Sequence, residues 1–133
     1  MKKVLIVCAN YYSQISSSLI KSSTQVLKKN RINFKIIYVP GTYEIPFIVS
    51  KYIKNYIGCI TLGCLIKGKT AHFDLIANSV FDNIIKISIS NNKPITNGII
   101  TAYNKKQAIQ RKEKKGLEAA KALLNILNGP GKR

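Results

Sequence analysis

Residues 58–66 read GCITLGCLI, a stretch of nine residues without a charged side chain. A continuous apolar run of this length is typical of a β-strand that is buried on both faces of its sheet. Three further runs of similar character occur at 3–9 (KVLIVCA), 34–39 (FKIIYV) and 94–102 (PITNGIITA). We therefore predict four strands that belong to one sheet.

Between these runs, apolar residues recur at helical spacing. The predicted helices cover 16–30, 43–56, 72–90 and 105–127. Pro46 is tolerated only near the first turn of the second helix, and we expect the last helix to be interrupted or kinked near Gly116. Apolar strands that alternate with helices indicate a parallel sheet covered on both faces. The predicted fold is α/β, a three-layer α/β/α sandwich with a four-stranded parallel sheet, and residues 1–133 form a single domain.

Residues 63–70, GCLIKGKT, match the phosphate-loop pattern G-x-x-x-x-G-K-[ST] of nucleoside triphosphatases. A working phosphate loop starts where its strand ends, because the residues after the first glycine must curl so that their amides face phosphate. Here Cys64, Leu65 and Ile66 extend the apolar strand beyond Gly63. The other predicted strands contain no carboxylate that could hold the magnesium ion of such an enzyme. We interpret the match as a coincidence.

The net charge of +17 raises the question of an anionic partner. Most of the lysines and arginines fall on the wet faces of the predicted helices, and aromatic residues do not alternate with them as a base-stacking surface requires. We therefore expect no nucleic-acid partner, although the positive field would attract a small phosphorylated anion. No apolar run approaches the roughly 20 residues that span a bilayer, so we expect no membrane segment and a cytoplasmic location.

Cys8, Cys59 and Cys64 all lie within or beside predicted strands. Three cysteines at this spacing suit neither a disulfide framework nor a zinc site. We expect buried free thiols, as in a reducing compartment, and no bound metal.

In an open α/β sheet, ligands bind beyond the carboxyl ends of the strands. One such end is followed by KGKTAHFD, residues 67–74, where a helix start and neighbouring lysines would favour an anion. His72, the chain's only histidine, falls in this first turn. It could exchange protons with a ligand held there, or it could be an ordinary surface or packing residue.

Other strand ends carry further candidates, each with a plain structural alternative. Glu44 could accept hydrogen bonds from hydroxyl groups, or simply favour the start of a helix. Tyr11 and Tyr12 could offer a flat ring to an aromatic ligand, or pack in the core. Arg111 could bind phosphate through its fork of donors, or be one more exposed cation.

Taken in order, six segments of the chain resemble the lumazine synthase family. The segments are IVCANYYSQIS (6–16), VPGTYEIPF (39–47), TLGCLIKGKTAHFD (61–74), KPITNGIIT (93–101), QAIQR (107–111) and KGLEAA (115–120). The resemblance implies a transferase of riboflavin biosynthesis that needs no metal and no organic cofactor. Its two small-molecule substrates would be 5-amino-6-(D-ribitylamino)uracil and 3,4-dihydroxy-2-butanone 4-phosphate.

The resemblance also implies roles for matching residues. The pyrimidine ring would stack on Tyr11, and the same substrate would contact two short segments, Thr42, Tyr43 and Glu44 and then Cys64, Leu65 and Ile66. The phosphate would be held by the amides of Lys69 and Thr70 and by Arg111. Proton transfer would fall to His72. Lys115 and Glu118 match charged positions near the site.

In the family the pocket lies between neighbouring subunits of a pentamer, so we expect a homo-oligomer in which Asn97 and Arg111 close the pocket from the partner. Asn97 stands where many members carry phenylalanine, and Lys67 replaces a commoner arginine. The first strand starts at residue 3, and the stretch between Arg111 and Lys115 is short. Both features favour a free pentamer, or a decamer, over a sixty-subunit shell.

Two other functions remain compatible with these residues. A catalytically inactive protein that binds flavin or lumazine would keep the fold and the pocket without turnover. A basic nucleic-acid-binding module would show an affinity that falls steeply with salt.

Overall fold

The computed structural model describes residues 2–68 and 72–129 of the chain. Its centre is a parallel sheet with the strand order β2-β1-β3-β4. The strands are β1 (Lys3–Ala9), β2 (Asn33–Val39), β3 (Gly58–Ile66) and β4 (Ile95–Ala102). The four-stranded parallel sheet is therefore confirmed, and β3 covers the stretch 58–66 from end to end.

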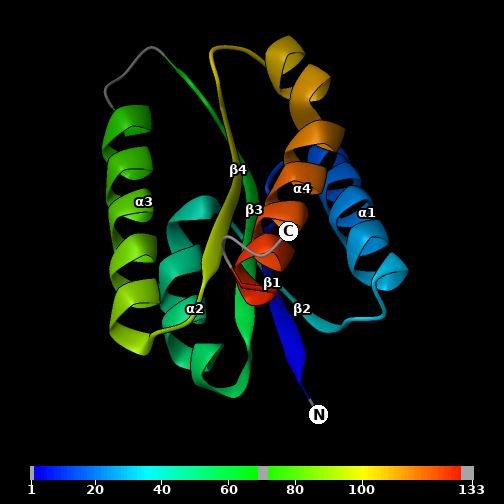
Figure 1. The fold of residues 1–133 in the computed structure, drawn as a ribbon. Helices are drawn as coiled ribbons and strands as arrows, with labels where there is room; N and C mark the ends of the chain where they lie inside the picture. The colour runs from blue at the N-terminus through cyan, green and yellow to red at the C-terminus, as the bar shows by residue number, and fades with distance from the viewer. Residues whose placement is uncertain (1, 69–71, 130–133) are drawn as a thin grey trace.

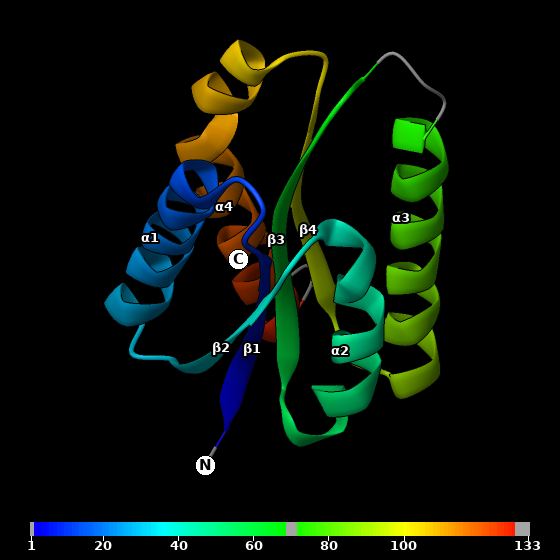
Figure 2. The same ribbon diagram turned by 180° about the vertical axis from the view of Figure 1, so that it is seen from behind.

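Helices cover both faces of this sheet (Figure 1, Figure 2). One face carries α1 (Ser13–Lys29) and α4 (Lys105–Leu127), and the other carries α2 (Ile45–Tyr52) and α3 (His72–Asn91). The predicted three-layer sandwich is confirmed. Among the described residues, no helix combines the length and the apolar character that crossing a membrane requires.

The buried strand β1 shows why the apolar runs are continuous. Val4, Ile6 and Cys8 belong to the core beneath α1 and α4. Leu5 and Val7 belong to the core on the opposite face. Because successive side chains of a strand point to opposite faces, a strand with a core on each side needs apolar residues at every position.

Two of the predicted helices differ from the structure. The stretch 43–56 is not one helix: a 3-10 turn at Thr42–Glu44 precedes α2, and a second 3-10 turn at Ile53–Asn55 follows it. Pro46 lies at the start of α2, where its missing N–H costs no hydrogen bond.

The interruption predicted near Gly116 is wrong, because α4 is continuous from Lys105 to Leu127. Gly116 is buried where α4 crosses α1. A Cβ atom at this position would lie 2.6 Å from the carbonyl oxygen of Leu19 and would also meet the Ser22 hydroxyl. The glycine thus permits close approach of two helices and does not break one of them.

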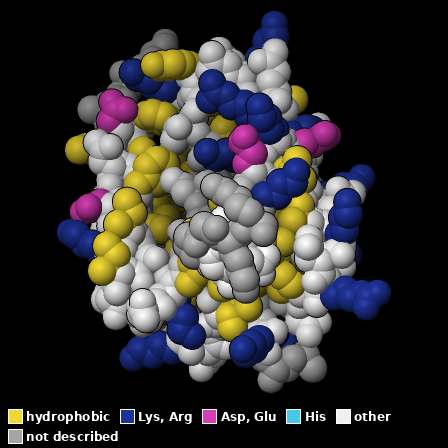
Figure 3. Space-filling model, viewed as in Figure 1, with side chains coloured by type: hydrophobic (Ala, Val, Ile, Leu, Met, Phe, Trp, Pro, Cys, Tyr) yellow, Lys and Arg dark blue, Asp and Glu magenta, His cyan; other side chains and the backbone are white. Residues whose placement is uncertain are grey.

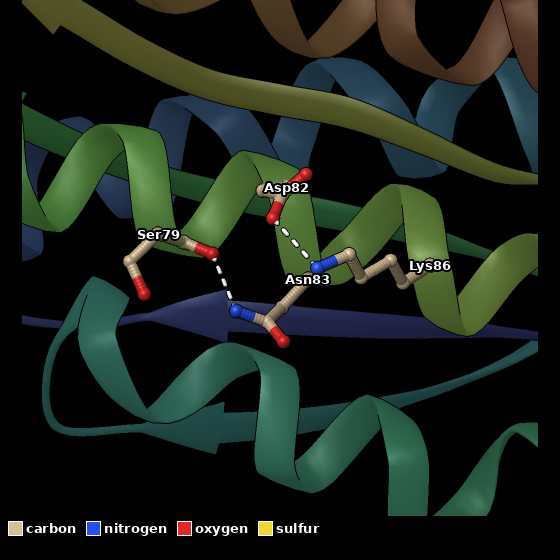
Figure 4. Close-up of polar contacts among 4 residues, drawn as sticks. All are labelled: Ser79, Asp82, Asn83 and Lys86. Carbon is tan, nitrogen blue, oxygen red and sulfur yellow. Dashed lines mark hydrogen bonds and ion pairs between the residues drawn. The ribbon is translucent and has the colours of Figure 1, made fainter.

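The outer surface of α3 is held by local contacts. The Lys86 ammonium lies 3.0 Å from the Asp82 carboxylate, one helical turn away, and Asn83 Nδ2 donates to the Ser79 carbonyl at 2.7 Å (Figure 4). Both members of the ion pair are more than 60% exposed, so the pair contributes little to stability.

Candidate functional site

A cavity of about 340 Å³ opens at the carboxyl ends of β1 and β3. Its lining comes from four parts of the chain: Tyr11, Tyr12, Gly41, Thr42, Tyr43, Cys64, Leu65, Ile66, His72 and Ile76. Eight of the candidate residues named from the sequence are among them, all except Gly41 and Ile76. Parallel strands end at one edge of the sheet, and this brings together segments that are far apart in the sequence.

The two tyrosines of the cavity lie in the link between β1 and α1. Their rings make an edge-to-face contact, with centroids 4.9 Å apart and planes at 86°. Tyr12 is half-buried, whereas Tyr11 is 74% exposed. Ser16 in α1 donates its hydroxyl to the carbonyl of Ala9 at 2.7 Å, which fixes the start of the helix on the end of the strand. Tyr11 therefore offers a free ring face on a fixed support.

The turn at Thr42–Glu44 packs directly on β3 beside the cavity. A Cβ atom on Gly63 would lie 3.2 Å from Thr42 Oγ1 and 3.2 Å from the Ala9 side chain. Gly63 is the first glycine of the phosphate-loop pattern, yet it lies inside a strand that continues to Ile66. Its role is to let the turn approach the sheet, so the interpretation of the pattern as a coincidence is confirmed.

Glu44 lies beside the cavity without lining it. It is half-buried, and its backbone N–H donates to the Gly41 carbonyl at 3.2 Å. A Cβ atom on Gly41 would lie 3.1 Å from the Glu44 carboxylate. Since Gly41 lines the cavity, the Glu44 carboxylate lies next to a residue of the cavity wall.

Burial keeps the cavity thiol in its neutral form. Cys64 is 7% exposed, and desolvation raises its pKa to about 11. Burial also raises the pKa of Tyr12, with smaller contributions from Cys64 and Tyr11. Neither group ionises near neutral pH, so neither serves as a base or nucleophile there. Cys8 and Cys59 are buried free thiols, as predicted.

His72 is the first residue of α3, and its side chain lines the cavity. An imidazole can both accept and donate a proton, as acid–base chemistry in the cavity would require. Ile76, one turn further along, lines the same cavity, as residues four apart on a helix do. Lys69 and Thr70, the predicted phosphate-binding positions, lie outside the described residues.

Arg111 lines a different cavity of the same chain. This second cavity, of about 230 Å³, is lined by Lys67, Phe73, Asp74, Thr101, Ala102, Tyr103 and Arg111. Arg111 Nη1 donates to the Thr101 carbonyl at 3.0 Å, and the Lys67 ammonium lies 5.5 Å from the centre of the Tyr103 ring. Within one chain, His72 and Arg111 therefore line different cavities.

Three other predicted residues lie on β4 and α4. Asn97 is exposed in β4, where its Oδ1 accepts a hydrogen bond from the Ile99 N–H at 2.9 Å. Lys115 and Glu118 lie on α4, the first half-buried and the second exposed. None of the three is among the described residues that line either cavity.

The sequence pattern missed several lining residues. Ile76 and Phe73 were not predicted to line a site. The helical spacing from His72 to Ile76 was the one available signal. No group of three His, Cys, Asp or Glu residues that could hold a metal ion occurs in the described part of the chain.

The fold and the first cavity define an α/β sandwich protein with a cavity at the carboxyl edge of a parallel sheet. The family model described as 6,7-dimethyl-8-ribityllumazine synthase matches residues 1–130. The chain belongs to this family, which confirms the resemblance found in the sequence.

Individual relatives carry the same name. The 6,7-dimethyl-8-ribityllumazine synthase of Buchnera aphidicola subsp. Baizongia pistaciae is 41% identical, over 96% of this chain and 86% of the relative. Those of Limosilactobacillus reuteri and Leuconostoc mesenteroides subsp. mesenteroides are 36% and 38% identical, over 92% and 96% of this chain and 86% and 87% of the relative.

Proposed function

We propose that this chain is a 6,7-dimethyl-8-ribityllumazine synthase of riboflavin biosynthesis. It condenses 5-amino-6-(D-ribitylamino)uracil with 3,4-dihydroxy-2-butanone 4-phosphate, acts as one domain in the cytoplasm, and needs no metal or organic cofactor. The observation that supports this proposal most strongly is that one cavity is lined by His72, Tyr11, Thr42 and Tyr43. The chain also belongs to this family.

The reaction consists of condensations and eliminations that the cavity suits. The 5-amino group attacks the butanone carbonyl and water leaves to form an imine. Elimination of phosphate follows, and the ribitylamino nitrogen then closes the second ring with loss of another water. Each step moves a proton, which His72 takes up and returns. The ring of Tyr11 and the turn at Thr42 orient the uracil, and positioning supplies much of the remaining acceleration.

The test is a turnover assay with both substrates in the presence of a metal chelator. We expect a fluorescent lumazine product whose formation follows protein concentration. Tight lumazine binding without any turnover would contradict an enzyme and favour a binding protein of the same fold.

The phosphate-binding arginine comes from a neighbouring copy in this proposal. His72 and Arg111 line different cavities of one chain, which supports the expectation that a second copy brings its Arg111 to the first cavity. Large apolar side chains on α2 and α3 are exposed, with Phe47 at 69%, Leu75 at 67% and Ile89 at 75%. Yellow side chains run down the side of the molecule that α3 covers (Figure 3). Such surfaces commonly mark protein contacts.

We expect the assembly to be a pentamer, with a mass of about 74 kDa for five chains of 14.8 kDa. Ile89→Glu on α3 should shift the mass toward that of a single chain, because a charge would be buried at the contact. Ile126→Glu is the matched control, since Ile126 is exposed on α4. Mass photometry and sedimentation velocity measure both. A particle near a megadalton would contradict the pentamer, and equal effects of both changes would contradict a contact through α3.

Arg111→Ala should chiefly raise the apparent KM for the butanone phosphate, by about 10- to 100-fold, as expected for the loss of a charged hydrogen bond. The KM for the uracil substrate should change little. Lys114→Ala, at an exposed position on the same helix, is the control for lost charge. Steady-state kinetics with each substrate varied in turn measure the difference. A uniform fall in kcat with both KM values intact would remove Arg111 from the phosphate site.

A further inference from the structure

A third cavity lies at the opposite end of the sheet. Its volume is about 540 Å³, and it is lined by Lys3, Lys28, Arg31, Ile32, Asn33 and Phe34. Lys3 pairs with Asn33 at the amino ends of β1 and β2. The seven residues of β1 separate this cavity from the first by about 20 Å, at the usual rise of a strand. The two sites are therefore physically independent.

The cavity is strongly cationic. Three cations line it, and no carboxylate does so among the described residues. The first acidic residue of the chain is Glu44, whereas residues 1–43 contain seven lysines and arginines. On the face shown in Figure 3, the lowest third of the molecule carries Lys and Arg side chains and no carboxylate. Like charges that surround a hollow raise its positive potential and concentrate small anions there.

The backbone at Arg31 has a conformation that usually requires glycine. Its φ is 57°, in the left-handed region, directly after the end of α1. The Arg31 N–H donates to the Lys28 carbonyl at 3.0 Å, and the Ile32 N–H donates to the Leu27 carbonyl at 2.9 Å. This pattern is the Schellman motif, whose left-handed position usually holds glycine because a β-carbon is disfavoured there.

The dipole of α1 explains only part of the group of cations that line this cavity. Lys28 and Lys29 complement the negative end of the α1 dipole. Arg31 lies beyond the helix at a conformational cost, and Lys3 comes from β1. The dipole favours a cation at Arg31 but does not require one in the left-handed conformation, and it does not account for Lys3.

We propose that this cavity is a second ligand site, and that it binds a small anion with two or more phosphate groups in a row. The three cations face the phosphates, and a volume of this size suits a small molecule. Phe34 and Ile32 are half-buried in the wall and offer apolar surface to a nucleoside. The shared chemistry is a phosphate chain, which either free polyphosphate or a nucleoside triphosphate supplies.

The test uses the full-length protein, with inorganic tripolyphosphate, adenosine triphosphate and orthophosphate as probes in isothermal titration calorimetry at constant ionic strength. The cavity variant combines Lys3→Gln, Lys28→Gln and Arg31→Gln. The control combines Lys21→Gln, Lys51→Gln and Lys121→Gln, which removes the same charge from exposed positions outside the cavity. We expect tripolyphosphate to bind the wild type and the control alike, and the cavity variant about tenfold or more weakly, because charged hydrogen bonds are lost.

Several outcomes would overturn the proposal. They are equal losses in the two variants, orthophosphate binding as tight as that of tripolyphosphate, and binding of an RNA oligonucleotide with neither small probe. Tighter binding of adenosine triphosphate than of tripolyphosphate would identify the nucleotide as the source of the phosphate chain, and the reverse order would identify free polyphosphate. Either order supports the site.

Arg31→Gly gives a second, independent readout. Because glycine relieves the left-handed backbone, this variant should unfold at a higher temperature than the wild type, and it should bind tripolyphosphate more weakly. Tripolyphosphate should also raise the melting temperature of the wild type more than that of the variant. A variant with lower stability and unchanged affinity would refute the role of Arg31. Lumazine turnover should be unaltered in all these variants, so the proposed enzyme activity and the second site stand or fall separately.

Discussion

Replacing His72 by alanine is expected to lower kcat for lumazine formation by about 100- to 10,000-fold, the range in which general acid–base catalysis contributes. The KM of either substrate should change much less, because Tyr11, Thr42 and the end of β3 still line the cavity. The side chain is exposed at the first position of a 20-residue helix, whose buried residues Ala77, Val80 and Ile84 lie further along. Its removal should therefore leave the fold intact.

His72→Asn separates proton transfer from polarity. Asparagine keeps a hydrogen-bonding side chain but does not exchange protons near neutral pH. We expect the same loss of kcat as with alanine, because neither side chain can take up and return a proton in place of the imidazole. Stopped-flow measurement of product formation under single-turnover conditions isolates the chemical steps from product release. Unchanged kcat in both variants would show that protons move by another route.

Gly116→Ala is expected to destabilise the protein by about 3 kcal/mol, the upper end for overpacking a tight interior. On an exposed helix the same change stabilises by about 1 kcal/mol. Here the added methyl would lie 2.6 Å from the Leu19 carbonyl oxygen and 3.2 Å from its Cα, and backbone atoms have no alternative rotamer. The clash therefore outweighs the gain in helix propensity, since α1 and α4 would have to separate.

Urea unfolding followed by circular dichroism measures this difference. Gly68→Ala is the control, because a Cβ atom at Gly68 would lie within 4 Å of none of the described residues other than its chain neighbours. We expect the control to change the free energy of unfolding by less than about 0.5 kcal/mol, as is usual for surface positions. Equal stability of Gly116→Ala and the wild type would show that the α1–α4 contact is looser than the distances indicate.

The sheet was the part most readily predicted from the sequence. Strands such as β1 and β3 have a hydrophobic core on each side, so they need an apolar residue at nearly every position. The resulting continuous apolar run distinguishes them from the helices. Helix ends were less predictable. Pro46 fits a helix start and a turn equally well, so the division of 43–56 into two 3-10 turns and α2 was missed. Gly116 was interpreted from propensity, whereas its reason is a contact with α1.

Some residues of the candidate site could be predicted from the sequence and others could not. Tyr11, Thr42 and Cys64 follow or end parallel strands, so their convergence follows from strand order. Asn97 is the third residue of β4 and lies well before the strand's carboxyl end. In the proposed assembly, Asn97 and Arg111 would meet His72 only across the contact with a second copy of the chain. The pattern of one chain contains no information on how two copies are arranged.

The glycine at position 63 has a wider lesson for motif searching. A regular expression assigns it to ligand recognition, whereas it is kept free of a side chain by two neighbouring pieces of the same polypeptide. A glycine that is required for packing can therefore match the sequence motif of a phosphate-binding loop. A genome-wide search with this pattern alone would therefore count too many nucleotide hydrolases. Each match should be checked for a β-strand that continues through the first glycine of the pattern.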